Sequence, residues 1–330
     1  MEEGCAMIFM NMNCNHILMN NIIVRNGFIM NPTIEVTPSI RISPFTENDL
    51  GMVDFDTKSA TEYLKNRFNN YCLTIKARDA IFLALSYYEL KKDDVVTILT
   101  TSGNYYISSC VTKEIEKFCL WSRELSNKTK LIFVNHEFGY PLENLEEVKG
   151  YGLPIIEDYA HTFVSENEKR QTSKIGDFII YSLPKYFPMQ IGGILVAEQS
   201  KLNSLHYTIS TDNCDYILGH LSLSIPSLEE ISKKRLFNYA YLKNKLQHLG
   251  IVPFFPEKKN IVPGVFLFRW NDNINYDLLK EFMQANGVES SVFYGENAFF
   301  IPIHHKLEVA HLDYMISLLN YFKEKYITNT

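Results

Sequence analysis

Two apolar segments decide the fold of this 330-residue chain: GLPIIEDYAHTF (152–163) and GDFIIYSLPKYFPMQIGGILVAE (176–198). Each begins with a short apolar run, which is typical of a buried strand. The first run ends in Glu157 and Asp158, and Lys185 follows shortly after the second. In open parallel sheets, ligands bind outside the carboxyl ends of the strands. The two segments therefore predict a binding site at that edge of a sheet.

Up to about residue 225, apolar strand-like runs alternate with helical patterns, which is typical of a parallel sheet flanked by helices. The predicted strands are residues 95–99, 130–134, 153–157, 178–182 and 194–198. The predicted helices are two within 56–90, of which the second begins near Arg78, one over 108–125 and a short one over 142–150. The expected fold class is therefore α/β, with a mostly parallel central sheet.

After about residue 225 the pattern changes to long amphipathic helices with isolated strands. Helices are predicted over 227–250, 276–288 and 311–326, where apolar positions recur at helical spacing, and a strand over 265–270. We therefore predict two domains. Residues 1–225 form an N-terminal arm and a large α/β domain, and residues 226–330 form a small α+β domain.

The composition bounds the function classes. The net charge of -6 provides no basic field for nucleic acid or an anionic membrane. No apolar stretch has the roughly 18 residues of a membrane span, and Glu2 and Glu3 stand where an export signal would be basic. The six cysteines include no CxxC pair, which favours reduced thiols. We expect a cytoplasmic protein that binds a small molecule, with no metal site.

Asp158 and Lys185 together have the chemistry that pyridoxal phosphate requires. A carboxylate pairs with the pyridine nitrogen of this cofactor, and an amine reacts with its aldehyde. Each residue alone has a simpler interpretation, since a strand-end Asp often caps the next helix and most lysines are solvated. However, Lys185 lies within the apolar and aromatic YSLPKYFP (181–188). Such surroundings would lower the pKa of the amine and make it nucleophilic.

Four neighbouring residues have open interpretations. Glu157 alternates away from Asp158 along the strand, so the two acids need not share a role. His161 is either a structural hydrogen-bonding residue or a cofactor contact. Gly192 and Gly193 either turn the chain between strands or allow the backbone to pass close to a flat ring.

The order of four motifs resembles the DegT/StrS type of nucleotide-sugar aminotransferases, within the aspartate-aminotransferase superfamily. These motifs are IFVNHEFGYP (132–141), GLPIIEDYAH (152–161), GDFIIYSLPK (176–185) and GGILVAE (192–198). The resemblance covers about residues 70–200, and FFIPIHHKL (299–307) resembles the family's last strand more loosely. It implies the pyridoxal-phosphate transferase fold of type I and a homodimer, because family active sites form at a subunit interface.

The resemblance also implies a role for several residues. Lys185 would bond covalently to the cofactor, and Asp158 would pair with the protonated ring nitrogen. His161 would lie near the ring's phenolic oxygen, and Ser182 would contact the phosphate. The family's phosphate helix corresponds to the helix start at Ala77 and Arg78, where free backbone amides favour an anion. A ring that stacks on the cofactor would come from Tyr105, with Asn104 beside it.

The sequence departs from the family at two of these places. The family begins its phosphate helix with Gly and Thr, whereas this chain has Ala77 and Arg78. Arg78 either contacts the phosphate through a charge-assisted bond or points at a core acid. Only two residues separate Ser182 from Lys185, which is a tighter turn than in the family. The tighter turn counts against the phosphate contact that the resemblance implies for Ser182.

The expected function is a two-stage amino transfer that uses pyridoxal phosphate. An amino-acid donor such as glutamate would load the cofactor, and a keto-sugar carried on a nucleotide would then receive the amine, with Lys185 moving the proton. Such a reaction belongs to nucleotide-sugar and polysaccharide biosynthesis. One alternative is a dehydratase or isomerase of sugar nucleotides that uses the same cofactor. Another is a non-catalytic binding or regulatory protein that retains the fold.

Overall fold

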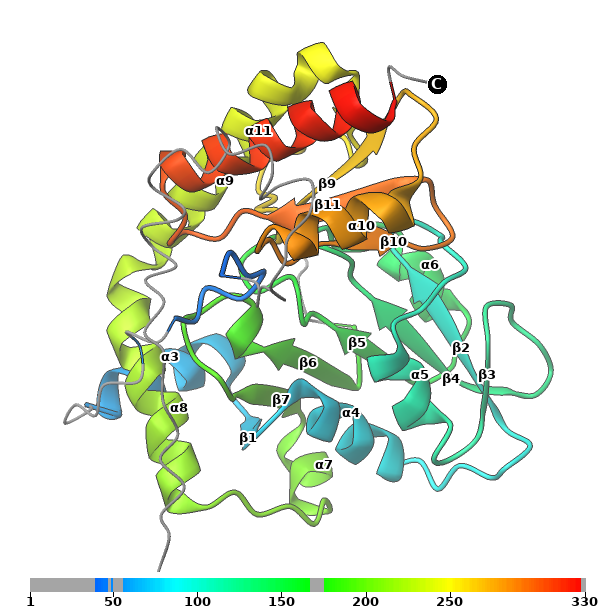
Figure 1. Ribbon diagram of the computed structural model, residues 1–330. Coiled ribbons are helices and arrows are strands. Elements are labelled where there is room, and N and C mark those ends of the chain that lie inside the picture. Colours follow the sequence, from blue (N-terminus) through cyan, green and yellow to red (C-terminus); the bar gives the residue numbers. More distant parts are fainter. Residues whose placement is uncertain (1–38, 47–48, 50–55, 167–174, 328–330) are drawn as a thin grey trace, which may run out of the picture.

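The computed structural model describes residues 39–46, 49, 56–166 and 175–327, and these residues form two β-sheets with separate cores (Figure 1). The predicted N-terminal arm falls mostly on residues 1–38, which lie outside the described residues. We call the larger sheet with its helices the large domain, and the smaller sheet with its helices the small domain.

The larger sheet has seven strands in the order β1-β7-β6-β5-β4-β2-β3. Its strands are β1 (Tyr71–Thr74), β2 (Val95–Thr100), β3 (Leu120–Ser122), β4 (Thr129–Asn135), β5 (Ile155–Asp158), β6 (Phe178–Ser182) and β7 (Gly193–Ala197). The run from β3 to β6 is parallel, whereas β7 pairs antiparallel with both β6 and β1. The sheet is therefore mostly parallel, and the predicted α/β class is confirmed.

Two predictions in this domain are wrong. The region 56–90 contains the helices α3 (Lys58–Phe68) and α4 (Ala77–Ser86), but the strand β1 separates them. The helix predicted over 108–125 is only α5 (Ser109–Ile115), and β3 follows it. Both missed strands lie at the edges of the sheet. Each is held by the ladder of one neighbouring strand, and such a tertiary contact overrides local preference.

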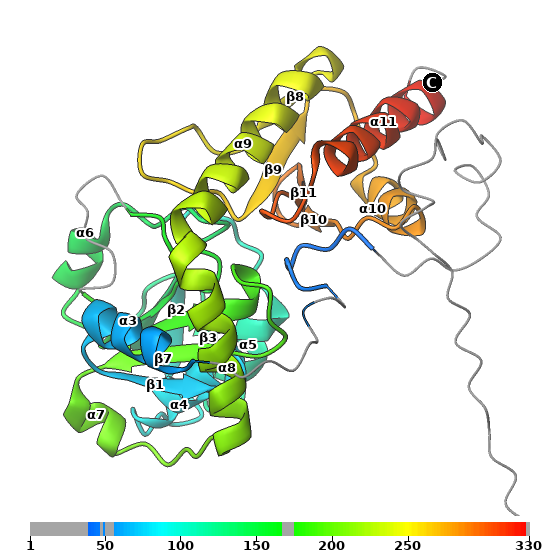
Figure 2. The same ribbon diagram turned by 90° about the vertical axis from the view of Figure 1, so that its left-hand side faces the viewer.

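Helices cover both faces of the large sheet (Figures 1 and 2). On one face α4 and α5 pack on the buried residues Ile98, Phe133, Ile156, Ile180 and Leu195. On the other face lie α3 and α8 (Thr211–Ser224), of which α8 was not predicted. Two short helices, α6 (Leu145–Gly150) and α7 (Gln199–Asn203), complete the domain. The carboxyl ends of β4, β5 and β6 remain uncovered by these helices and point toward the small domain.

The smaller sheet is antiparallel, in the order β10-β11-β9-β8. Its strands are β8 (Ile251–Pro253), β9 (Val265–Trp270), β10 (Ser291–Phe293) and β11 (Ala298–Pro302). The helices α9 (Leu228–Leu246), α10 (Tyr276–Ala285) and α11 (Val309–Tyr326) share one core with it. None of the helices in the described part of the chain has the length and apolarity needed to cross a membrane.

The second face of the small sheet is turned toward the large domain. Val265 and Leu267 of β9 cluster there with Phe138, which follows β4. The α9 helix is shared, because its Ile231 packs in a large-domain core whereas Leu242 packs in the small-domain core. Figure 2 shows α9 rising from one domain to the other. We retain the domain boundary near residue 225 as a proposal.

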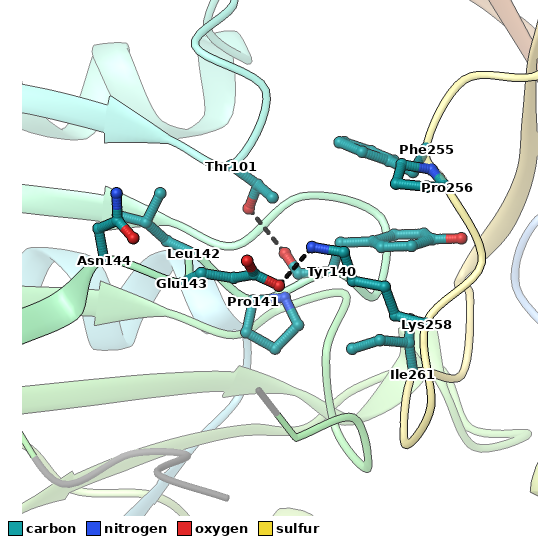
Figure 3. A pocket seen from close by; sticks show the side chains of 10 residues that line it. All are labelled: Thr101, Tyr140, Pro141, Leu142, Glu143, Asn144, Phe255, Pro256, Lys258 and Ile261. Carbon is teal, nitrogen blue, oxygen red and sulfur yellow. Dashed lines mark hydrogen bonds and ion pairs between the residues drawn. The ribbon is translucent and has the colours of Figure 1, made fainter. Parts of the chain in front are cut away.

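Beside this contact, a cavity of about 260 Å³ separates the loop after β4 from the loop between β8 and β9 (Figure 3). The ring of Tyr140 stacks on that of Phe255, with 4.4 Å between centroids. Lys258 forms an ion pair with Glu143 across the same cavity. The two charges neutralise each other, so neither residue presents an unpaired charge to this cavity at the junction of the domains.

Candidate active site

A larger cavity, of about 520 Å³, lies at the carboxyl ends of β4, β5 and β6 and extends to β10. Six residues that the sequence singled out line it: Ala77, Arg78, Asp158, His161, Ser182 and Lys185. The remaining lining residues include Ile42, Lys76, Tyr106, Ser108, Ser109, Cys110, Asn135, Glu137, Phe138, Ser291 and Tyr294. The edge of the sheet predicted for the site is therefore the edge where the cavity lies.

Asp158 is the last residue of β5 and is only 5% exposed. Its Oδ1 accepts a hydrogen bond from the backbone N–H of Ala160 at 2.9 Å. Burial raises the pKa of this carboxyl to about 6, although the Ala160 bond and the nearby His136 and Lys185 act in the opposite direction. A cation that entered the cavity beside Asp158 would therefore meet a carboxylate with little competing solvent.

Lys185 ends a single 3-10 turn, Leu183–Lys185, that follows β6 directly. The flanking Tyr186 and Phe187 are buried in the core below the turn, whereas Lys185 is exposed and lines the cavity. The prediction that aromatic neighbours would enclose the amine is thus wrong. The aromatic side chains anchor the turn instead, and the lysine side chain extends away from them.

His161 belongs to the turn after β5 and also lines the cavity. Burial, together with the positive charges of Lys185 and Arg235, lowers the pKa of this imidazole to about 3. His161 is therefore neutral at physiological pH. A neutral imidazole can donate one hydrogen bond and accept another, which suits an interaction with a ligand oxygen.

The start of α4 forms a further part of the cavity wall. Gly193 of β7 lies so close that a Cβ at this position would be 2.3 Å from Thr74 Oγ1 and 2.8 Å from the backbone N of Ala77. Gly193 therefore serves the close packing of strand against helix start, rather than a turn. The preceding residue, Gly192, has a φ of +136°, a backbone conformation that residues with a side chain rarely adopt.

Of the two interpretations left open for Arg78, the structure shows the contact with a core acid, while the phosphate contact remains a prediction. Arg78 lines the cavity, and its Nη2 donates a hydrogen bond to Cys110 Sγ at 2.9 Å. Its Nε also lies 3.8 Å from the carboxylate of the buried Glu114, and Glu114 forms an ion pair with Lys117 as well. The guanidinium is half exposed and thus retains a face toward the cavity.

The structure does not bring Asn104 and Tyr105 to the cavity. Asn104 is 1% exposed; its amide donates to Tyr294 O at 2.6 Å and its Oδ1 accepts from Tyr106 N at 3.1 Å. These bonds make it a structural residue of the loop. Tyr105 is 72% exposed and is not among the lining residues. Tyr106 lines the cavity in its place, with its ring 5.3 Å from that of Tyr294.

Three cavity residues at and after the end of β4 were not predicted from the sequence. Asn135, Glu137 and Phe138 all line the cavity. Glu137 is buried, and its carboxylate accepts a hydrogen bond from Ser102 N at 2.7 Å. A signal is present in the sequence, because the motif IFVNHEFGYP contains the carboxyl end of β4, which belongs to the same parallel sheet as Asp158.

Behind the cavity, Glu157 and His136 form a fully buried pair. Glu157 accepts hydrogen bonds from Gly176 N at 2.8 Å and Tyr159 Oη at 3.0 Å. His136 Nδ1 accepts from Leu142 N at 2.9 Å, so the ring proton lies on Nε2, which is 3.1 Å from Glu157 Oε2. The prediction that Glu157 points away from Asp158 is confirmed, because Glu157 is absent from the cavity lining.

The fold of this chain is found in solved aminotransferases. An aminotransferase, TlmJ from Streptoalloteichus hindustanus, superposes with a TM-score of 0.66 at 15% identity, over 80% of this chain and 90% of that one. A DegT DnrJ EryC1 StrS aminotransferase from Brucella abortus gives 0.64 at 14% identity, over 81% and 90%. The chain has the fold of the DegT/DnrJ/EryC1/StrS aminotransferases.

A curated relative adds a sequence match to this aminotransferase fold. EpsN of Bacillus subtilis (strain 168), provisionally assigned as a pyridoxal phosphate-dependent aminotransferase, is 29% identical over 127 residues. The match covers 32% of this chain and about a third, 33%, of EpsN. No protein-family model matches the sequence. The fold is thus shown for most of the chain, whereas the sequence likeness is limited to a part of it.

Proposed function

We propose that this protein is a pyridoxal phosphate-dependent aminotransferase that transfers an amino group from an amino acid to a keto-sugar. The observation that carries the proposal is that Asp158 and Lys185, far apart in the chain, line one cavity at the carboxyl ends of adjacent strands. The fold shared with solved aminotransferases and the provisional assignment of EpsN support it.

The residues of the cavity fit this cofactor. Burial disfavours the charged form of the Asp158 carboxyl group. A protonated ring nitrogen beside it would stabilise that charged form. The backbone amides at the start of α4 and the guanidinium of Arg78 suit a phosphate, with Ser182 beside them. Tyr106 supplies a ring at the cavity wall. Bound pyridoxal phosphate would supply an aldehyde for the amine of Lys185 and a ring that accepts electrons during amino transfer.

The chain's own residues then have distinct tasks. Asp158 stabilises positive charge at the far side of the cavity, because it is shielded from water. His161, held neutral, provides a hydrogen bond to a ligand oxygen. The amine of Lys185, on a short turn with buried neighbours, moves a proton between carbon atoms of bound molecules as a general acid and base. Its exposure to the cavity gives it access to a substrate.

We propose glutamate as the amino donor and a nucleotide-linked keto-sugar as the acceptor. We also propose that the reaction takes place in the cytoplasm and belongs to nucleotide-sugar and polysaccharide biosynthesis. We also propose a homodimer. The side of the cavity formed by Ser291 and Tyr294 is supplied by the small domain, which makes that domain the candidate for recognition of the sugar.

Borohydride trapping tests the proposal directly. Purified protein incubated with pyridoxal phosphate should absorb visible light, lose that band on reduction, and yield a modified peptide at Lys185 in a mass spectrum. Lys185→Ala should abolish both signals, whereas Lys76→Ala, which removes the other lysine of the cavity wall, should leave Lys185 modified. In a separate, unreduced sample, glutamate should convert the visible band to the amine form. A colourless protein with an unmodified Lys185 would contradict the proposal and favour a binding protein. A coloured protein that glutamate leaves unchanged would favour a dehydratase or isomerase.

A further inference from the structure

Arg235 of α9 is a charged side chain that is 0% exposed and is bonded to backbone carbonyls. Its Nη2 donates to the carbonyl oxygen of Lys185 at 3.1 Å and to that of Tyr186 at 3.3 Å. Its Nη1 donates to the carbonyl oxygen of Gly264 at 3.3 Å. Within the described residues, none of the ion pairs includes Arg235.

An isolated cation is costly to bury, and evolution normally pairs it with an acid or exposes its head. Burial does lower the pKa of Arg235, but only to about 10, so the side chain remains charged at physiological pH. Its guanidinium carbon also lies 4.5 Å from the ring centroid of Tyr186. The carbonyl dipoles and this ring therefore compensate a full positive charge. The positions of the carbonyl groups, the ring and the guanidinium consequently depend on one another.

The three carbonyls belong to both domains. Lys185 and Tyr186 belong to the turn that follows β6 in the large domain, and Gly264 directly precedes β9 in the small domain. Arg235 itself lies on the shared helix α9, between Ile231 of the large-domain core and Leu242 of the small-domain core. One side chain thus ties the backbone of the lysine turn to the junction of the two domains.

We propose that Arg235 is a positioning residue, which fixes the backbone of the Lys185 turn against the small domain and so sets where the Lys185 amine stands in the cavity. The role assigned to the amine rests on the proposed function, whereas the mechanical role of Arg235 does not.

The test compares the wild type with Arg235→Lys and Arg235→Met in the cofactor-free, full-length chain. Amide hydrogen exchange is measured over residues 183–189, where the N–H groups of Tyr186 and Phe187 donate to Leu183 O. Arg235→Lys keeps the charge but loses the planar fork that serves several carbonyls at once. Both variants should exchange this segment faster by about tenfold or more, because charge-assisted bonds are lost. Arg269→Met is the matched control, since Arg269 lies on β9 and pairs with Glu296 at the surface; it should leave the segment unchanged.

Trapping with pyridoxal phosphate provides the second readout. In Arg235→Lys the fraction of protein reduced at Lys185 should fall at equal cofactor concentration, with folding retained. Unchanged exchange over residues 183–189 in a folded Arg235→Lys protein would overturn the proposal. So would a uniform increase over the whole chain, which indicates general destabilisation. If the wild type is not trapped at Lys185 at all, the proposed function fails, and the exchange data still decide the role of Arg235.

Discussion

Asp158 illustrates how a residue proposed to bind the cofactor works against stability at the scale of one side chain. Its pKa is raised from 3.8 to about 6 by burial. Between about pH 4 and pH 6 the folded protein therefore binds more protons at this site than the unfolded chain, so the free energy of unfolding falls as the pH rises through that window. Above it, the buried carboxylate remains a destabilising charge.

Asp158→Asn should accordingly stabilise the cofactor-free protein. At about pH 7 the free energy of unfolding should rise by up to about 3 kcal/mol, since each pKa unit corresponds to about 1.4 kcal/mol, while the amide oxygen can still accept the bond from Ala160 N. Urea denaturation at a series of pH values measures this. At about pH 4 the two proteins should converge, and equal stability at both pH values would contradict the assigned cause. The variant should also retain pyridoxal phosphate less well.

The buried Glu157 behaves differently, because hydrogen bonds from three groups satisfy it. His136→Ala removes one donor and leaves a cavity beside a buried carboxylate. We expect a loss of about 3 kcal/mol in the free energy of unfolding, measured by thermal or urea denaturation. Glu157→Gln keeps the size of the side chain and should cost less. A His136→Ala protein as stable as the wild type would show that the His136–Glu157 pair does not contribute this free energy to stability.

At the residue scale, the sequence predicts strand-end side chains better than loop side chains. Asp158, His161, Ser182 and Lys185 line the predicted cavity, because the direction of a strand and its carboxyl end follow from the apolar pattern. The loop after β2 has no such regularity. Whether Tyr105 or Tyr106 faces inward there depends on the hydrogen bonds of Asn104, which no local pattern records.

At the scale of elements, the meeting of β7 with the start of α4 controls the shape of the proposed phosphate wall. Gly193→Ala would place a Cβ within 2.8 Å of Ala77 N and closer still to Thr74 Oγ1. We expect a loss of about 2–4 kcal/mol in the free energy of unfolding, since backbone atoms cannot yield cheaply. Urea denaturation measures it. The matched control is Gly150→Ala at the end of α6, where an added Cβ meets no atom within 4 Å; its stability should change by less than about 1 kcal/mol.

The elements that the sequence predicts are those with enough length or apolar regularity to be recognised alone. The strands β2, β4, β6 and β9 have continuous apolar or β-branched runs and were predicted within a residue or two. The four-residue β1 lies between two helices and acquires its ladder only from β7, which is distant in sequence. Its residues carry no signal of that partner, so the strand cannot be recognised before the fold is known.

For the whole molecule, the two domains should be held together by apolar stacking more than by charge. The Lys258–Glu143 pair is partly exposed on both sides, and such pairs are worth at most about 1 kcal/mol. Phe255 stacks on the buried Tyr140 and also contacts Phe254 edge-on. Phe255→Ala should therefore reduce the free energy of unfolding by about 2–3 kcal/mol, whereas Lys258→Met should change it by less than about 1 kcal/mol. Urea denaturation with limited proteolysis of the β8–β9 loop checks the order, and a larger effect of Lys258→Met would reverse it.

The cavity is assembled from segments spread between Ile42 and Phe300. During synthesis on the ribosome, Asp158 and Lys185 emerge long before Tyr294. Gly264, whose carbonyl oxygen accepts a hydrogen bond from Arg235, emerges after Lys185 and before Tyr294. A nascent chain stalled before β10 would present the strand ends to water without their cover from the small domain. The complete cavity therefore exists only late in biogenesis, and we expect the proposed vitamin-derived cofactor to be captured at that stage.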